Sequence, residues 1–333
     1  MALSVYVADA AAVTAAISMA DSIALMRQAF QALAAGRIEQ PLRTIIRSEL
    51  TAGFLGLMPA SVDDPAIYPG AVYGAKLGTM FPDNVRLGKD PHQGVVVLLS
   101  GQTGETLAVL DASSVTALRT AAVTGLATDL LARPDASVLA LFGTGHQAVC
   151  QLQAVAAVRP LTRVLVVSRD PANARRFAEH HAAEFPFVLE PSTAAAALAA
   201  ADIVVTATNS ATPVFERASL QPGTHVTAMG ASTPAFCEID GATMACARLF
   251  VDRAESTRAE SGEFRNAVRD GFLAADAPLI ELADLVTGRH PGRTSAGEIT
   301  LFKSLGLALE DVVMAAALRR RHELHGQGQC VTL

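Results

Sequence analysis

The sequence has little charge and no excess of basic residues. Of its 333 residues, 17% are charged and 51% are hydrophobic, and the formal net charge is -6. A nucleic-acid partner requires a basic surface, so this balance argues against nucleic acid as the main ligand. The low charge and the abundant apolar residues also argue against a disordered chain. We therefore expect a folded protein with a large buried core.

Long apolar runs, a basic leader and metal-ligand spacings are also missing. No apolar run is long enough for a membrane span. Asp9 and Asp21 interrupt the apolar N-terminal residues, so a signal peptide is not expected. The four cysteines show no CxxC spacing and the eight histidines are scattered, which argues against a structural zinc site. We expect a cytoplasmic protein with free thiols, no bound metal and no membrane partner.

Short strands follow one another closely in the first third of the chain. A helix precedes them, with Ile23, Met26, Phe30 and Leu33 at helical spacing and Gly36 at its end. The expected strands are residues 5–7, 45–46, 54–57, 73–77, 94–100 and 106–110. Strands in quick succession predict an antiparallel or mixed sheet.

Strands and helices alternate after residue 111. Ser113 or Ser114 is expected to cap a helix that runs to about Leu131. The expected strands that follow are residues 137–142, 164–167, 203–206, 225–229 and 249–251, and the expected helices are residues 147–157, 172–181 and 194–200. Continuous apolar strands that alternate with helices predict a parallel sheet covered on both faces. A last helix, residues 304–321, is expected to begin at Ser304 and to return to the first domain.

These patterns predict an α/β protein of two domains. One is a Rossmann domain with a doubly wound parallel sheet, at residues 116–303. The other is an α+β domain formed by residues 1–115 and completed by the C-terminal helix in residues 304–333.

A glycine-rich turn follows the first strand of the predicted Rossmann domain. Its residues are Gly143, Thr144, Gly145, His146, Gln147 and Ala148. Gly143 permits the tight turn, Gly145 lets the backbone approach a pyrophosphate, and Ala148 keeps helix and strand close. The N–H groups of the helix that follows favour phosphate. This segment predicts a nicotinamide dinucleotide site.

The end of the second Rossmann strand indicates which cofactor binds. An acidic residue there would favour NAD(H), whereas Ser168 and Arg169 suit the 2′-phosphate of NADP(H). We therefore predict NADPH, with NADH as the alternative if Asp170 faces the ribose instead.

Other strand ends add expected cofactor contacts. Thr206 and Thr208 end one strand, and Ala231 follows the next at the same carboxyl edge, where Ser232 is an expected substrate contact. Ligands of open parallel sheets bind at this edge.

The chain resembles the ornithine cyclodeaminase/mu-crystallin family along nearly its whole length. The segments that carry the resemblance are residues 41–44 (PLRT), 56–60 (GLMPA), Lys76, 118–122 (LRTAA), 143–148 (GTGHQA), 230–234 (GASTP), 238–240 (EID), 260–263 (ESGE) and 300–306 (TLFKSLG). The resemblance implies that residues 1–115 and 304–333 bind substrate and form a homodimer. It does not fix the reaction, because members include cyclodeaminases, alanine dehydrogenases and reductases of cyclic ketimines.

Departures from the family pattern reduce the number of reactions that we expect. Ornithine cyclodeaminases carry an acid where this chain has Gly56 and a catalytic Asp where it has Ser232. Cyclodeamination needs an acid at the second amine, which neither residue supplies. These positions and residues 302–304 (FKS) resemble the ketimine reductase branch, which tends to use NADPH. The expected reaction is reduction of 1-pyrroline-2-carboxylate or 1-piperideine-2-carboxylate to L-proline or L-pipecolate.

The resemblance also assigns residues to the substrate. Arg43, Lys76 and Arg119 would face it, with the arginines holding a carboxylate. A desolvated Lys76 would donate a proton, or would only bind the carboxylate, and Lys76 and Arg119 are the predicted catalytic residues. The structural alternatives are an edge-strand lysine at residue 76 and a buried ion pair at Arg119.

The remaining predicted positions carry weaker signals. Met58 would shape the pocket or pack in the core, and His92 would touch substrate or lie in a loop. Ser304 would cap the last helix and also lie near the nicotinamide. The other predicted cofactor contacts are Thr120, Met229 and Gly230. The alternatives to a ketimine reductase are an alanine-dehydrogenase-like enzyme, an ornithine cyclodeaminase, and a crystallin-like protein that binds NADPH without turnover.

Overall fold

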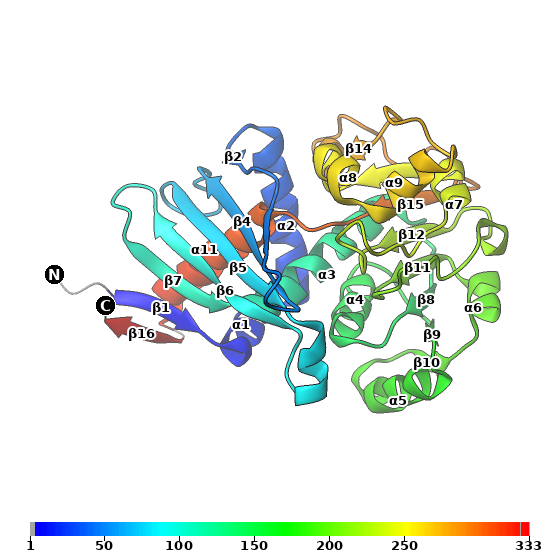
Figure 1. Cartoon of the computed structure of the whole chain (residues 1–333), viewed down its shortest axis with the longest axis horizontal. Coiled ribbons are helices and arrows are strands. Elements are labelled where there is room, and N and C mark those ends of the chain that lie inside the picture. The colour runs from blue at the N-terminus through cyan, green and yellow to red at the C-terminus, as the bar shows by residue number, and fades with distance from the viewer. Residues whose placement is uncertain (1–3, 327, 333) are drawn as a thin grey trace. The chain divides into compact units, whose positions relative to one another are not determined.

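The computed structural model describes residues 4–326 and 328–332 (Figure 1). The chain divides into two compact units. Unit 1 comprises Met1–Arg119 and Leu307–Leu333, and unit 2 comprises Thr120–Gly306. The boundaries lie three to four residues beyond the expected ones at 115/116 and 303/304, and the first falls inside helix α3 (Ala112–Leu131).

Unit 1 contains a curved, mostly antiparallel sheet with helices on one face (Figure 1). Its strands are β1 (Ser4–Ala8), β2 (Ile38–Glu39), β3 (Thr44–Arg47), β4 (Phe54–Val62), β5 (Val72–Met80), β6 (His92–Ser100), β7 (Thr106–Asp111) and β16 (Gln329–Thr332). They are ordered β16-β1-β7-β6-β5-β4-β2, with β3 paired to β4. The helices are α1 (Ala10–Ala16), α2 (Met19–Ala34), α11 (Ala308–His325) and the 3-10 turn η1 (Pro82–Leu87).

Helix α11 packs on the inner face of the unit 1 sheet and is buried along ten of its residues. A Cβ on Gly74 of β5 would lie 2.9 Å from the Val312 methyl groups, so glycine allows this helix to approach the strands closely. Side chains alternate between the two faces of a strand, so residues 58, 76 and 96 point inward together with residues 74 and 98.

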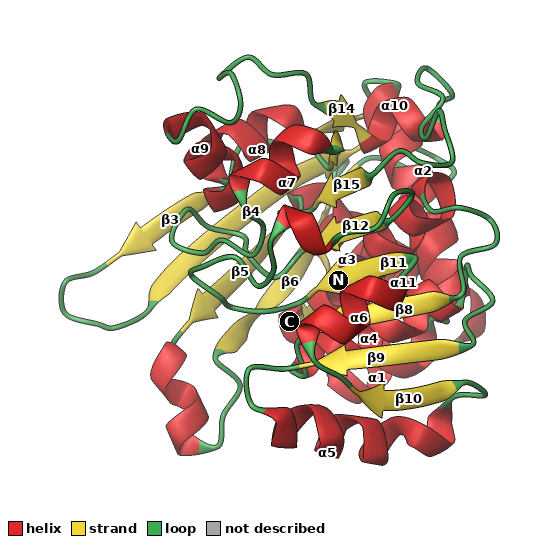
Figure 2. Ribbon diagram, turned by 90° about the vertical axis from the view of Figure 1, so that its right-hand side faces the viewer, coloured by secondary structure: helices red, strands yellow, loops and turns green. Residues whose placement is uncertain are grey.

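Unit 2 contains a parallel sheet between two layers of helices (Figure 2). Its strands are β8 (Val138–Phe142), β9 (Arg163–Val167), β10 (Val188–Pro191), β11 (Ile203–Thr206), β12 (His225–Ala228), β13 (Arg248–Val251), β14 (Ile280–Glu281) and β15 (Thr300–Lys303), in the order β10-β9-β8-β11-β12-β15-β13-β14. The helices are α4 (His146–Ala156), α5 (Pro171–His181), α6 (Ala194–Ala200), α7 (Gly241–Cys246), α8 (Ala254–Glu260), α9 (Gly262–Arg269) and α10 (Leu282–Val286), with 3-10 turns η2 (Ala182–Glu184) and η3 (Arg217–Ser219).

Alternate residues of the central unit 2 strands enter two separate cores. Leu139 and Leu141 of β8 pack with Leu152 of α4, whereas Ala140 and Phe142 belong to the cluster on the other face. The strands are therefore apolar on both faces, as expected for a covered parallel sheet. The predicted fold class, a doubly wound sheet with a second α+β domain, is confirmed.

Two predicted helix starts are wrong. Asp111 rather than Ser113 or Ser114 caps α3, because its Oδ1 accepts a hydrogen bond of 2.8 Å from the Ser114 N–H. The last helix begins at Ala308 rather than at Ser304, because residues 300–303 form the central strand β15 and Gly306 (φ 78°) turns the chain after it.

No single described helix is long and apolar enough to cross a membrane. Helices α1 and α2 together pass the same test as a pair bent by 84°, which is weak evidence because core helices pass it as well.

Candidate active site

The turn between β8 and α4 has the geometry of a pyrophosphate cradle. Gly143 has φ 111°, and a Cβ there would lie 2.3 Å from the Ala207 carbonyl oxygen, so only glycine fits. A Cβ on Gly145 would meet no atom within 4 Å. Gly145 is the N-cap of α4 and no side chain caps the helix. The turn thus combines open space with the N–H groups of a helix N-terminus, which fits a dinucleotide phosphate. Thr144 lies in this turn, and His146, Gln147 and Ala148 are the first three residues of α4.

Asp170 is engaged by the helix that follows β9. Its Oδ1 accepts a hydrogen bond of 2.9 Å from the Ala172 N–H, so Asp170 is the N-cap of α5, with Pro171 at the first helical position. Arg169 is exposed and Ser168 is half-buried at the same strand end. The carboxylate that would favour NAD(H) therefore has a structural role already.

Glu238 holds together two turns at the carboxyl edge of the unit 2 sheet. Its Oε1 accepts hydrogen bonds of 2.7 Å from both the N–H and the hydroxyl of Thr208. Its Oε2 accepts hydrogen bonds from the N–H groups of Gly230, at 2.7 Å, and Ala231, at 3.2 Å. A Cβ on Gly230 would lie 2.1 Å from the Thr208 carbonyl oxygen, so glycine is required for this approach. Burial raises the pKa of the Glu238 carboxyl, and the Lys303 charge opposes that shift.

Lys303 and Glu263 extend the hydrogen-bond network of Glu238. Lys303 Nζ donates to the Ala231 carbonyl oxygen at 2.6 Å and to Glu263 Oε1 at 3.0 Å, and both side chains are at most 1% exposed. The Glu238 N–H also donates to Glu263 Oε1. Glu238 Oε2 and the Lys303 ammonium group therefore fix the backbone of residues 230–231, and Glu263 holds the ammonium group in place.

Two hydroxyl groups at this edge have no hydrogen-bond partner among the described residues. They belong to Thr206 at the end of β11 and Ser304 after β15, and both residues are at most 1% exposed. Buried hydroxyl groups are usually paired, so these two fit polar groups of a bound dinucleotide. Met229 is buried and Ser232 is half-buried beside them, and Thr120 is buried in α3.

Lys76 lies in a central strand of unit 1 and points to the inner face. Strand β5 pairs with both β4 and β6, so the edge-strand explanation for this lysine is wrong. Its Nζ donates a hydrogen bond of 3.2 Å to Thr116 Oγ1 and lies 2.9 Å from Asp311 Oδ2, as an ion pair rather than an aligned hydrogen bond. Burial lowers the Lys76 pKa to about 8, against the attraction of Asp311.

Arg119 forms a buried ion pair with two adjacent acids of helix α11. Its NH1 lies 2.6 Å from Glu310 Oε2 and its Nε lies 3.1 Å from Asp311 Oδ1. Both carboxylates are fully buried, and Glu310 also accepts a hydrogen bond of 3.0 Å from the Leu307 N–H at the start of the helix. The ion-pair alternative for Arg119 is thus observed, and it places Arg119 beside Lys76.

A row of glycines crosses the unit 1 sheet two residues along β5 from Lys76. Lys76 pairs with Met58 and Val96, and two positions along β5 Gly78 pairs with Gly56 and Gly94. A Cβ on Gly78 would have only the Gln93 carbonyl oxygen within 4 Å, at 3.9 Å. A Cβ on Gly56 would lie 3.5 Å from Ile45 Cδ1, so the open part of this row on the inner face is at Gly78, two residues from Lys76.

The structure brings some of the other predicted substrate residues to this region. Met58 is 7% exposed and shares the inner face with Lys76. The charge of Arg43 lowers the Lys76 pKa, though less than burial does, so Arg43 acts electrostatically on that ammonium group. His92 is the first residue of β6, is exposed, and has its Nδ1 3.9 Å from Asp90 Oδ1.

Sequence reasoning missed the acids that organise both clusters. Glu238 and Glu263 lie in segments that carry the family resemblance, but nothing in their spacing indicated a role. Glu310 and Asp311 gave a stronger signal, because they are two acids within a long apolar segment. Such acids are rarely buried unless they are paired.

The comparisons with known proteins agree with these features. The family model of the ornithine cyclodeaminase/mu-crystallin family matches residues 4–325. The chain belongs to this family. The chain is 35% identical to a Delta(1)-pyrroline-2-carboxylate reductase of Bacillus cereus over 94% of this chain and 95% of that protein. It is 34% identical to the mouse ketimine reductase mu-crystallin over 84% of each.

A solved structure is similar over the whole fold. It is the Delta(1)-pyrroline-2-carboxylate reductase of Thermococcus litoralis in complex with NADH and L-proline. The TM-score is 0.92 at 32% identity, with 98% of this chain and 100% of that chain covered. The family resemblance deduced from the motifs is therefore confirmed.

Proposed function

We propose that this protein reduces a cyclic ketimine carboxylate with a nicotinamide cofactor. The substrates would be 1-pyrroline-2-carboxylate or 1-piperideine-2-carboxylate, and the products L-proline or L-pipecolate. The observation that carries the proposal is Lys76, a lysine with a pKa of about 8 that is held beside Arg119 and within the field of Arg43. The two relatives named as reductases of such imines support it.

The reaction adds a hydride to the imine carbon and a proton to the imine nitrogen. The reduced nicotinamide supplies the hydride, and the turn at Gly143–Gly145 with the N-terminus of α4 would hold its pyrophosphate. Protonated Lys76 gives its proton to the imine nitrogen and is neutral afterwards; solvent then returns the proton. A pKa of about 8 suits this role near neutral pH, because both forms of the amine are accessible.

The charges around Lys76 also suit a carboxylate substrate. Lys76, Arg119 and Arg43 carry three positive charges, and Glu310 and Asp311 carry two negative charges. These cations would attract a substrate carboxylate. Arg43 would bind the carboxylate, and Arg119, which binds two acids, would add attraction.

The glycine row gives the substrate ring a place on the inner face of the unit 1 sheet. With open space over Gly78, a flat ring would fit over strand β5 beside the Lys76 ammonium group. An acid at residue 56, which a cyclodeaminase would need there for a second amine, is absent.

NADPH is the proposed cofactor in preference to NADH. Arg169 is exposed after β9, and the exposed Asp170 carboxylate accepts the Ala172 N–H as the cap of α5. The Thermococcus litoralis reductase holds NADH, so both cofactors must be compared.

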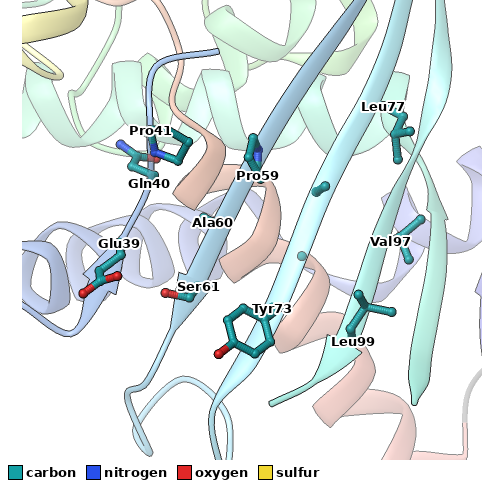
Figure 3. Close-up of a pocket in the computed structure, with 12 residues that line it drawn as sticks. Glu39, Gln40, Pro41, Pro59, Ala60, Ser61, Tyr73, Leu77, Val97 and Leu99 are labelled. Atoms are coloured by element: carbon teal, nitrogen blue, oxygen red, sulfur yellow. The ribbon is translucent and has the colours of Figure 1, made fainter. Parts of the chain in front are cut away.

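The outer face of the unit 1 sheet supports a homodimer. Figure 3 shows Tyr73, Leu77, Val97 and Leu99 on the side of the strands away from α11. They line a pocket of about 720 Å³. Tyr73 and Leu77 are 56% and 37% exposed. An antiparallel sheet usually presents polar residues to water, so an apolar outer face fits a second copy of the chain.

The substrate panel tests the proposed reaction. Initial rates of NADPH and NADH oxidation are measured with each cyclic imine and with pyruvate plus ammonia. We expect turnover of a cyclic imine without ammonia, faster with NADPH. Turnover only with pyruvate and ammonia would replace this proposal with an amino acid dehydrogenase. Light scattering on the same sample measures the mass and tests the dimer.

A further inference from the structure

We propose that Asp311 is a positioning residue that sets the proton-donating state and the place of Lys76. The inference rests on the proposed function, because it assigns a partner to the proposed proton donor. Asp311 lies in helix α11, more than two hundred residues from Lys76 in sequence, and nothing in the family resemblance pointed to it.

The carboxylate of Asp311 bridges the two cations of the cluster. Its Oδ2 lies 2.9 Å from Lys76 Nζ and its Oδ1 lies 3.1 Å from Arg119 Nε. The Asp311 side chain is fully buried, so it cannot exchange these partners for water without moving helix α11. The carboxylate of Asp311 therefore links the positions of Lys76 and Arg119.

Helix α11 gives the carboxylate a rigid base. Asp311 is the fourth residue of the helix, where the helix dipole favours negative charge. The Leu309 N–H donates to the Gln40 side chain at 2.8 Å, and Glu310 caps the Leu307 N–H, so the first turn is fixed on both sides. Helix α11 packs against β4, β5 and β6 and so holds Asp311 next to Lys76.

The charged groups around Lys76 act in opposite directions. Asp311 on α11 attracts the proton of Lys76, whereas Arg119 on α3 and Arg43 before β3 repel it. Thr116 adds a hydrogen bond without charge. Asp311 is thus the acid that keeps a proton on Lys76 despite burial and two nearby arginines.

Glu310 provides a matched control. It is the adjacent acid, it is equally buried, and it binds Arg119 and accepts the Leu307 N–H. Asp311→Asn and Glu310→Gln each remove one negative charge from the cluster. Asp311→Asn removes the carboxylate that lies 2.9 Å from Lys76 Nζ.

The test is the pH dependence of kcat/KM with the cyclic imine for both variants. Protonated Lys76 is needed, so the wild-type value falls as the pH rises through the Lys76 pKa of about 8. Loss of Asp311 removes the group that raises this pKa, so Asp311→Asn shifts the fall to lower pH by about one unit or more. Glu310→Gln lowers kcat/KM through Arg119 and leaves the position of the fall near the wild-type value. Equal shifts in both variants, or none in Asp311→Asn, would overturn the assignment.

A second variant guards against a folding defect. Asp311→Glu keeps the charge but moves the carboxylate. Its kcat/KM should therefore fall at close to the same pH as in the wild type, even if kcat is lower. A shift as large as that of Asp311→Asn would mean that the helix, not the charge, matters.

A second readout does not depend on activity. The chain has three lysines, Lys76, Lys89 and Lys303, so pulse labelling with acetic anhydride at a series of pH values can be resolved residue by residue by mass spectrometry. Exposed Lys89 serves as the internal reference. Lys76 should label at lower pH in Asp311→Asn than in the wild type. An unchanged labelling curve would contradict the inference, even in a protein whose substrate is a different imine.

Discussion

Two buried lysines occupy opposite situations in the two units. Lys303 in unit 2 is 1% exposed, and its ammonium group donates to the Ala231 carbonyl oxygen and to Glu263 in a network that includes Glu238. Lys76 in unit 1 has a side chain 11% exposed, an ion pair with Asp311, and a neighbouring strip of sheet without side chains. The same residue type is thus used once to hold a turn in place and once, in our proposal, to transfer a proton.

The difference lies in what surrounds each ammonium group. Around Lys303 the carboxylates outnumber the cation, and their remaining oxygens bind backbone N–H groups and hydroxyls. Around Lys76 two arginines oppose one contacting acid, and burial lowers the Lys76 pKa to about 8. A closed network stabilises structure, whereas a lysine near its titration point beside open space suits chemistry.

Removal of the Lys76 ammonium group should produce the largest loss of activity. For Lys76→Met we expect kcat/KM for the cyclic imine to fall about 1000-fold, within the usual range for loss of a general acid. NADPH binding, measured by fluorescence titration, should change little. Lys89→Met alters an exposed lysine and is the control. Activity within tenfold of wild type would remove Lys76 from the chemistry.

Removal of the other buried lysine should mainly affect stability. Lys303→Met leaves the buried Glu263 carboxylate without its cation, which costs about 3–5 kcal/mol of the free energy of unfolding. Lys76→Met should cost about 1 kcal/mol or less, since Asp311 keeps Arg119 and the burial cost of an ammonium group is relieved. The chain has no tryptophan, so urea unfolding is followed by circular dichroism. Equal losses in both variants would erase the distinction between the two clusters.

The choice of cofactor is expected to depend on a single exposed arginine. Arg169→Glu should lower the ratio of kcat/KM for NADPH to that for NADH by about 10- to 100-fold, the worth of one hydrogen bond to a charged group. Arg175→Glu makes the same charge change on helix α5 and tests whether net charge alone is responsible. A ratio that moves equally in both variants would exclude a specific contact at Arg169.

The smallest of the predicted effects concerns the glycine row, which should determine the size of the substrate ring that the enzyme accepts. Gly78→Ala adds a methyl group to the inner face of β5, where only the Gln93 carbonyl oxygen is within 4 Å. We expect the six-membered imine to lose about 10-fold more kcat/KM than the five-membered one, the effect of one methyl group in a pocket. The ratio of kcat/KM for the two imines is measured within one variant, so a general loss of activity cancels. Equal losses on both substrates would place the ring elsewhere.

Local patterns in the sequence were sufficient for the fold and the phosphate turn. Continuous apolar strands alternate with helices after residue 111, and their two faces enter two cores, so pattern and structure agree. The Gly143 turn was predictable because its conformation depends on neighbours in sequence. Ser304 was misassigned as a helix cap because strand β15 is defined by pairing with β12 and β13, which are distant in the chain.

The charged clusters could not be predicted in the same way. Lys76 and Arg119 were expected near substrate, but their partner Asp311 lies in the last helix and reaches them through tertiary packing. Likewise Glu238 and Lys303 come from separate segments. Asp170 followed by Pro171 is a typical helix start, so its capping role could be predicted from the sequence. An Asp at this strand end can also bind the ribose of NAD(H), and the sequence alone does not separate the two roles.

The central claim is that Lys76 protonates a cyclic imine, and its most direct test is the pH profile of kcat/KM for wild type and Lys76→Met with one cyclic imine. Ionisation of the substrate affects both enzymes equally, so their ratio isolates the lysine. We predict that the wild-type advantage is constant below about pH 8 and decreases about tenfold per pH unit above it, as Lys76 loses its proton. A ratio that stays constant from pH 6 to 10 would contradict the claim, because the advantage of the lysine would then be independent of its charge.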